Sequence, residues 1–169
     1  MRILVDGYNL LRRRVAGRDA DPLDLEAERT ELLDRLAAYR RVRSHAITVI
    51  FDGRDAPPGL DREGRHRGIL VRYSRQGETA DQVIAGLARE AGRGLVVVTS
   101  DRDLARAVER SGATAIAAEI FAAKMDAAEL EDLKGEEEER EGGASRARRG
   151  PSHRPDKAGR RRQAAQDRL

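Results

Sequence analysis

The sequence predicts an α/β fold in which helices cover both faces of a mostly parallel sheet. Three short runs rich in β-branched residues lie at positions 3–5, 47–51 and 95–100, and each is followed directly by an aspartate. These aspartates are Asp6, Asp52 and Asp101. Such runs are typical of strands buried in a parallel sheet, and the helical stretches between them favour strand–helix alternation.

The first strand is expected at residues 2–6, followed by a loop that carries Arg12. Asp21 and Pro22 have the form of an N-cap followed by proline in the first helical position. They predict a helix that continues to about residue 42. The second strand is expected at residues 46–51, where the apolar run resumes.

Turn-forming residues fill positions 52–59, and a basic segment follows before a third strand expected at residues 69–73. Thr79-Ala80-Asp81-Gln82 has the form of a capping box and predicts the start of a helix, which Gly92 ends.

A fourth strand is expected at residues 95–99, and a helix begins after it at Ser100-Asp101-Arg102-Asp103 and closes at Gly112. A short fifth strand is expected at residues 113–117. The last helix of the domain is expected to run from there to about Lys134.

The chain is expected to divide into a folded domain at residues 1–134 and a charged tail at residues 135–169. The tail opens with an acidic block and continues with arginines among Gly, Ser and Pro, and nothing apolar recurs in it periodically. Segments of this composition cannot bury enough apolar surface to fold, so we expect the tail to be disordered.

Composition narrows the function classes. The chain contains no cysteine, which excludes disulfides and thiolate sites. It has no apolar run long enough to span a bilayer and no visible signal peptide, so a cytoplasmic protein without membrane contact is expected. Residues 1–75 hold 16 Lys+Arg and 12 Asp+Glu, whereas residues 76–134 hold 7 and 11. A polyanion would meet the basic half, and the acidic half suits a metal.

The aspartates after the strands carry the functional argument. Ligands of open α/β sheets bind outside the carboxyl ends of the strands, so Asp6, Asp52 and Asp101 are expected at one edge. Carboxylates that crowd together stay ionised when a cation lies among them. Hard cations with oxygen ligands, such as Mg²⁺ or Mn²⁺, fit such a site and point towards phosphate chemistry.

Each acid also has a purely structural interpretation. Asp6 in Asp6-Gly7-Tyr8-Asn9 suits a turn, and Asp52 suits the Gly53 turn that follows it. Asp81 and Asp101 stand at helix starts, where a carboxylate favours the helix dipole, and Asp103 suits a capping box. The common placement of these acids, and no single one of them, supports a site.

The arginines of the first half are the candidate contacts to nucleic acid. Aromatic residues make up only 3% of the chain, so contacts to a nucleic-acid backbone are expected rather than base stacking. The arginines at residues 54–75 also have a structural interpretation, because charged residues of this kind more often belong to a solvated loop than to a binding surface. The candidates are Arg12, Arg54, Arg62, Arg65 and Arg67.

Four short motifs, in this order, resemble the NYN domain, and more narrowly its bacterial YacP-like branch within the PIN-like nuclease superfamily. They cover about residues 1–130. The motifs are Asp6-Gly7-Tyr8-Asn9, Phe51-Asp52-Gly53, Glu78-Thr79-Ala80-Asp81 and Thr99-Ser100-Asp101-Arg102-Asp103-Leu104.

The resemblance implies a PIN-like three-layer sandwich and a metal-dependent endoribonuclease that leaves a 5′-phosphate and a 3′-hydroxyl. It implies Asp6, Asp81 and Asp101 as ligands of Mg²⁺ or Mn²⁺, with Asn9 as a fourth catalytic group. The supporting residues that it implies are Asp52, Ser100 and Asp103. RNA is the expected partner, with messenger RNA on the ribosome as one option, and no organic cofactor is expected.

Three alternatives stay open beside this interpretation. A haloacid-dehalogenase-type phosphatase needs an acid two residues after Asp6, where Tyr8 stands. A toprim-type domain fits Asp101-Arg102-Asp103 but needs a glutamate in the place of Asp6. The third is a catalytically inactive RNA- or ribosome-binding adaptor with the same fold. The scattered histidines do not suggest a catalytic pair, and no Gly-rich phosphate loop with a lysine occurs.

Overall fold

The computed structural model describes residues 1–12, 22–56 and 61–147. Its contacts divide the chain into two units, Met1–Leu133 and Lys134–Leu169. The candidate site lies in the first unit, whose architecture is described below. No helix in the described ranges has both the length and the apolar character that crossing a bilayer requires.

The described residues form a six-stranded sheet with the strand order β3-β4-β2-β1-β5-β6. Every neighbouring pair is parallel except β3 and β4. The predicted mostly parallel α/β sheet is therefore confirmed. The strands are β1 (Arg2–Asp6), β2 (Ala46–Phe51), β3 (Glu63–His66), β4 (Ile69–Tyr73), β5 (Leu95–Val98) and β6 (Thr114–Ile116).

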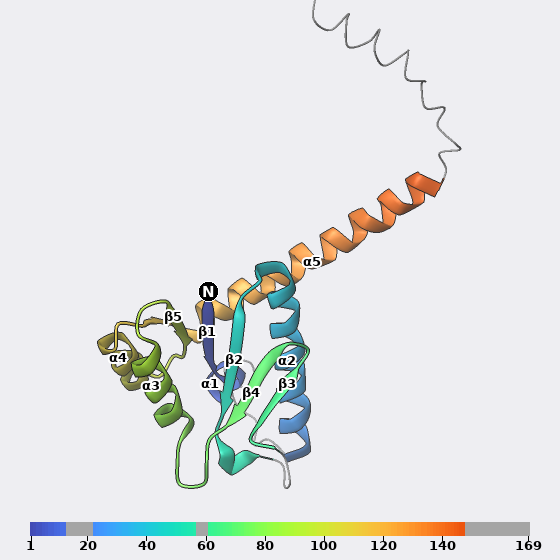
Figure 1. Ribbon diagram of the computed structural model, residues 1–169. Helices are drawn as coiled ribbons and strands as arrows, with labels where there is room; N and C mark the ends of the chain where they lie inside the picture. Colours follow the sequence, from blue (N-terminus) through green and yellow to red (C-terminus); the bar gives the residue numbers. More distant parts are fainter. Residues whose placement is uncertain (13–21, 57–60, 148–169) are drawn as a thin grey trace, which may run out of the picture. The chain divides into compact units, whose positions relative to one another are not determined.

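Helices lie on both faces of this sheet and complete a three-layer sandwich (Figure 1). One buried cluster joins one face of the sheet to α1, α2 and the first turns of α5, and the other joins the opposite face to α3 and α4. The helices are α1 (Gly7–Arg12), α2 (Pro22–Arg43), the short 3₁₀ helix η1 (Gly53–Asp55), α3 (Ala80–Ala91), α4 (Arg102–Arg110) and α5 (Ala118–Ala147).

Successive side chains of the central strands belong alternately to the two buried clusters. In β1, Ile3 and Val5 belong to the cluster with α2, whereas Leu4 belongs to the cluster with α3. Successive side chains of a strand point to opposite faces, so a continuous apolar run serves both layers at once. The apolar runs that predicted the strands are therefore explained by burial on both faces.

Three elements differ from the sequence prediction. The loop expected after β1 is the short helix α1, because Leu10 and Leu11 bury their side chains against the sheet. The basic segment before β4 contains the antiparallel edge strand β3. The last helix continues past Lys134 to Ala147, through residues rich in the strong helix formers Glu, Ala and Arg.

Gly53 holds the ends of β2 and β4 together. Its amide donates a hydrogen bond of 2.9 Å to Ser74 Oγ, and Ser74 Oγ donates one of 2.9 Å to the carbonyl oxygen of Glu78. A Cβ atom at Gly53 would lie 2.1 Å from the carbonyl oxygen of Ser74. The backbone contact therefore has room for glycine alone.

We expect Gly53→Ala to lower the free energy of unfolding by about 1–3 kcal/mol, because the added methyl group forces two backbone segments apart. Gly64→Ala is the matched control, since nothing lies within 4 Å of a Cβ atom there. Urea unfolding of the two variants measures the difference, and equal stabilities would contradict the close approach at Gly53.

Candidate functional site

The candidate site lies where β1 and β5 end side by side. The chain leaves β1 for β2 on one side, and later crosses through α3 to β5 on the other side of β1. This reversal of direction is a topological switch point, the place where open α/β sheets bind their ligands. We call the carboxyl ends of β1, β2 and β5, with the residues that follow them, the acidic edge.

Asp6 is the centre of the acidic edge. It is the last residue of β1, and only 7% of it is exposed. Its Oδ1 accepts a hydrogen bond of 3.2 Å from the amide of Asn9, and its Oδ2 accepts one of 3.2 Å from Thr99 Oγ1. Both carboxylate oxygens are thereby oriented by the chain itself.

Thr99 connects Asp6 to Asp101. The Thr99 hydroxyl is buried and accepts a hydrogen bond of 3.1 Å from the amide of Asp101 while it donates to Asp6. The carboxylate of Asp101 caps α4, because its Oδ1 accepts from the amides of Asp103 at 2.8 Å and Leu104 at 2.9 Å. The Thr99 hydroxyl group therefore links the carboxylate of Asp6 to the backbone of Asp101, and both residues are predicted metal ligands.

Asn9 and Ser100 form the second connection across the switch point. The side-chain oxygen of Asn9 accepts a hydrogen bond of 2.8 Å from the amide of Ser100. The Ser100 hydroxyl donates to Glu119 Oε2 at 2.5 Å and accepts from the amide of Ala118 at 2.9 Å. Ser100 thus holds the start of α5, which carries the carboxylate of Glu119, at the acidic edge.

Asp81 reaches the same edge from α3. Thr79 and Gln82 form the predicted capping box, and Ala80 is buried beneath the first turn against the sheet. The helix begins on the carboxyl side of β4 and returns to the amino side of β5, which places exposed Asp81 at the acidic edge.

The predicted cluster of three carboxylates is not assembled as the side chains stand. In the described ranges, no three residues of the types Asp, Glu, His and Cys lie close enough together to hold a metal ion. One reason is that Asp101 turns its carboxylate onto the amides of α4. Mg²⁺ nevertheless binds through only one or two protein carboxylates when water and substrate phosphates complete its shell. The oxygen donors present fit such a shared site.

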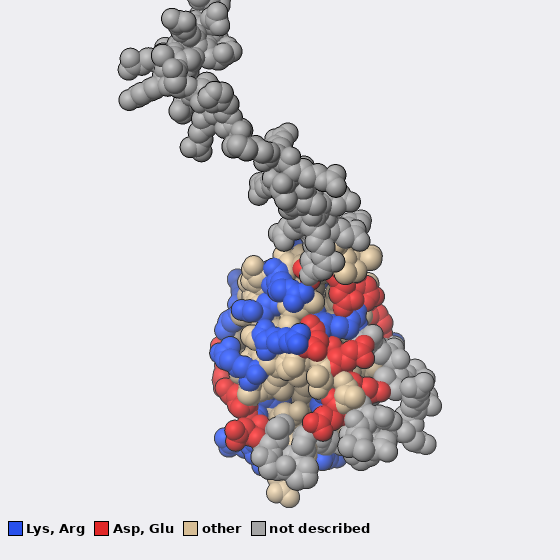
Figure 2. All heavy atoms as spheres, turned by 90° about the vertical axis from the view of Figure 1, so that its right-hand side faces the viewer, with Lys and Arg blue, Asp and Glu red and all other residues tan. Residues whose placement is uncertain are grey.

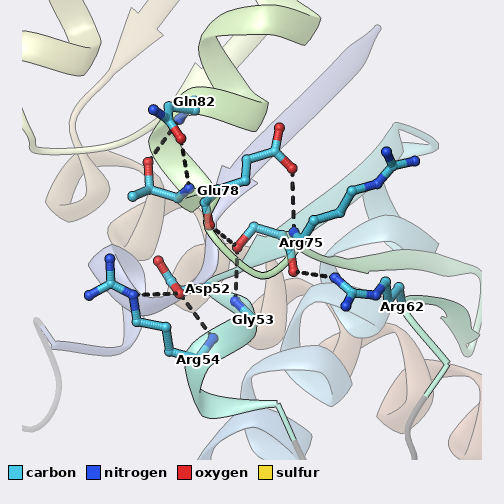
Figure 3. Close-up of polar contacts among 9 residues, drawn as sticks. Asp52, Gly53, Arg54, Arg62, Arg75, Glu78 and Gln82 are labelled. Atoms are coloured by element: carbon cyan, nitrogen blue, oxygen red, sulfur yellow. Dashed lines mark hydrogen bonds and ion pairs between the residues drawn. The ribbon is translucent and has the colours of Figure 1, made fainter.

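The two supporting acids lie at the periphery. Asp52 follows β2 and caps η1 by accepting a hydrogen bond of 3.0 Å from the amide of Arg54, as Figure 3 shows. Asp103 lies in the first turn of α4 with its side chain 95% exposed, 3.8 Å from Arg106. Both belong to the acidic edge and make local contacts there.

The candidate arginines fall into separate places. Arg54 lies beside Asp52, and Arg62 Nη1 donates a hydrogen bond of 3.2 Å to the carbonyl oxygen of Ser74, so both are near the acidic edge (Figure 3). Arg65 and Arg67 lie away from the acidic edge, because the antiparallel β3–β4 hairpin carries them towards the amino end of β4. The side chain of Arg12 lies outside the described residues.

The β3–β4 hairpin has a structural attachment to α2. His66 Nε2 lies 2.7 Å from Asp34 Oδ1, and Arg67 Nε lies 3.3 Å from the same atom. The hydrogen bond with His66 lowers the pKa of Asp34. Arg67 therefore has an ion-pair partner within the fold. Viewed from the side of α2 and β3, basic side chains gather along one side of this face (Figure 2).

Sequence reasoning missed Thr99 and Glu119. The apolar run predicts Thr99 as the end of a strand, and nothing in the pattern distinguishes Thr99 from a β-branched core residue. Glu119 lies three residues after the end of the short strand β6 (Thr114–Ile116), in the first turn of α5. The rule that found Asp6 and Asp101, an acid directly after an apolar run, would find Glu119 only if it allowed a few residues between the strand and the acid.

The three-layer sandwich and its acidic switch point define a PIN-like nuclease fold. The chain belongs to the YacP-like NYN domain family, whose model matches residues 3–157. The predicted family is thereby confirmed.

Individual relatives agree with this assignment. The uncharacterized protein YacP of Bacillus subtilis strain 168 is 29% identical over 87 residues, which are 52% of this chain and 51% of that protein. The match thus spans about half the length of this relative. The crystal structure of Rae1 (YacP) from Bacillus subtilis has a TM-score of 0.70 at 24% identity, over 87% of this chain and 86% of that chain. A mutant of it has a TM-score of 0.63 at 25% identity, over 77% of each chain.

We expect Thr99→Val to lower the free energy of unfolding by about 1–3 kcal/mol, because the buried Asp6 oxygen loses a donor and the Asp101 amide loses an acceptor. Thr99→Ser keeps the hydroxyl and loses one methyl group, which costs about 0.8 kcal/mol. Urea unfolding ranks the two variants. A serine variant less stable than the valine variant would contradict the role of the hydroxyl.

Proposed function

We propose that this protein is a metal-dependent endoribonuclease that hydrolyses phosphodiester bonds in RNA. The observation that supports this best is the chain of hydrogen bonds from Asp6 through Thr99 to Asp101 at the switch point. Membership of the NYN family favours RNA as the substrate. The expected products carry a 5′-phosphate and a 3′-hydroxyl.

Asp6 and Asp101, together with Asp81, are the proposed ligands of Mg²⁺ or Mn²⁺. When bound, the ion lowers the pKa of a water molecule and offsets the negative charge that grows on the phosphate. The chain supplies the rest: Asn9 and Thr99 fix the direction of the Asp6 carboxylate, and the burial of Asp6 keeps bulk water away from it.

Glu119 is proposed as a further acid of the site. Its carboxylate accepts the short hydrogen bond from Ser100, one residue before Asp101, and Ser100 in turn holds Asn9. Glu119 therefore controls the position of the loop that carries Asp101. Partners beyond RNA, including the ribosome, and the cytoplasmic location stay predictions.

Asp101→Asn should reduce RNA cleavage by about 100-fold or more, a loss typical of removing one electrostatic group from a transition state. Asparagine caps helices as well as aspartate does, so α4 should remain folded. The assay incubates purified protein with structured and unstructured RNA in Mn²⁺, Mg²⁺ or EDTA. Thermal unfolding checks that the variant is folded.

Glu109→Gln is the matched control, because it also removes one negative charge from α4 but lies near the other end of that helix. It should cleave RNA like the parent protein. Cleavage that persists in EDTA would rule out the proposed chemistry. RNA binding without cleavage in any metal would favour the adaptor instead.

Glu119→Gln should raise the Mn²⁺ concentration needed for half-maximal cleavage by about 10- to 100-fold, the range found for groups that orient metal ligands. Glutamine keeps an oxygen that can accept from Ser100, while the negative charge is lost. A metal titration of the cleavage rate measures the shift. An unchanged titration would show that Glu119 serves only to position α5.

A further inference from the structure

A long groove runs between β4 and α3, beside the acidic edge. Its larger part is a cavity of about 530 Å³, and a second cavity of about 280 Å³ adjoins it, since both are lined by Arg72, Leu87 and Glu90. Leu4 and Leu70 of the sheet line the second cavity, and Val83 of α3 lines the first. Apolar side chains of the sheet and of α3 therefore form part of the wall, and Glu63, Glu78 and Glu90 line the larger cavity as well.

One end of the groove opens at the acidic edge. Glu78 and Gln82 line the larger cavity, and Gln82 is the neighbour of Asp81 in the first turn of α3 (Figure 3). The other end reaches Ala46 and Leu95, which start β2 and β5 at the opposite edge of the sheet. A strand lying in the groove would thus lead to the proposed catalytic acids.

Arginines line the end of the groove that is near the acidic edge. Arg72 Nε lies 2.6 Å from Glu63 Oε2, so this charge is paired. Arg62 contacts only a carbonyl oxygen among the described residues, and a carbonyl does not neutralise a guanidinium. The exposed guanidinium of Arg75 has no partner in the described part of the chain, while its amide donates to Glu78.

Gly86 gives independent support. It lies in the middle of α3, where glycine costs about 1 kcal/mol relative to alanine. Nothing lies within 4 Å of a Cβ atom built there, and its φ is not positive, so neither packing nor backbone conformation in the described structure requires glycine. Gly86 lines the groove, and a glycine in such a place lets a ligand approach the helix backbone closely.

We propose that this groove holds a single RNA strand and leads it to the acidic edge, with phosphates on Arg62 and Arg75 and bases against the apolar wall. This rests on RNA being the substrate, as proposed above. Positive charge that tracks a strand beside a surface for its bases is the arrangement that single-stranded nucleic acid needs. It adds Arg75 to the individually named candidate contacts to RNA.

Gly86→Phe and Gly86→Ala form the test, measured as fluorescence anisotropy of a short labelled single-stranded RNA. Both are made in the full chain with Asp101→Asn, so that the RNA stays intact. Phenylalanine fills the groove and should weaken binding by at least about tenfold, equivalent to about 1.4 kcal/mol. Alanine improves the helix without filling the groove and should bind like the parent.

Arg75→Gln keeps the test decisive if the phenylalanine variant fails to fold. Loss of one phosphate contact on single-stranded RNA should reduce the slope of log K against log salt by about 0.7. Arg110→Gln, at the far end of α4, should leave the slope unchanged.

Unchanged RNA binding by folded Gly86→Phe, or an unchanged salt slope in Arg75→Gln, would overturn the groove proposal. Cleavage of RNA by the protein without these substitutions would still support the nuclease. A parent chain that neither binds nor cleaves RNA would overturn both proposals.

Discussion

The buried carboxylate of Asp6 is the constraint on which the site depends. A charge with so little exposure needs hydrogen-bond donors from its surroundings, and Asn9 and Thr99 supply them from two different segments. Meeting this need fixes the start of α1 and the end of β5 against each other. The hydrogen bonds that this one buried carboxylate requires thus set the geometry of the switch point.

From there the network spreads outward through short contacts. Thr99 reaches Asp101, Asn9 reaches Ser100, and Ser100 reaches Glu119 at the start of α5. Three segments that are distant in the sequence are joined by these hydrogen bonds. Such connected polar groups in a partly buried setting specify one arrangement of the chain more strongly than separate contacts do.

The sequence predicted the strands and the acids after them because both follow from local patterns: β-branched runs and polar residues at their ends. It could not show that Thr99, a β-branched residue within such a run, uses its hydroxyl to bind Asp6. The edge strand β3 escaped prediction because its exposed residues carry no apolar alternation. The separation of Arg65 and Arg67 from the acidic edge follows from that hairpin, so it was hidden for the same reason.

Asp101 has two roles that use the same carboxylate, as the cap of α4 and as a proposed metal ligand. Its carboxylate holds two amides at the beginning of α4. A cation that recruited this carboxylate would have to compensate for a lost helix cap, a cost of about 1 kcal/mol. The bare amides would then face whatever anion accompanied the cation. Filling of the switch point by a cation would therefore be coupled to fraying of a neighbouring helix, through the rotation of a single side chain.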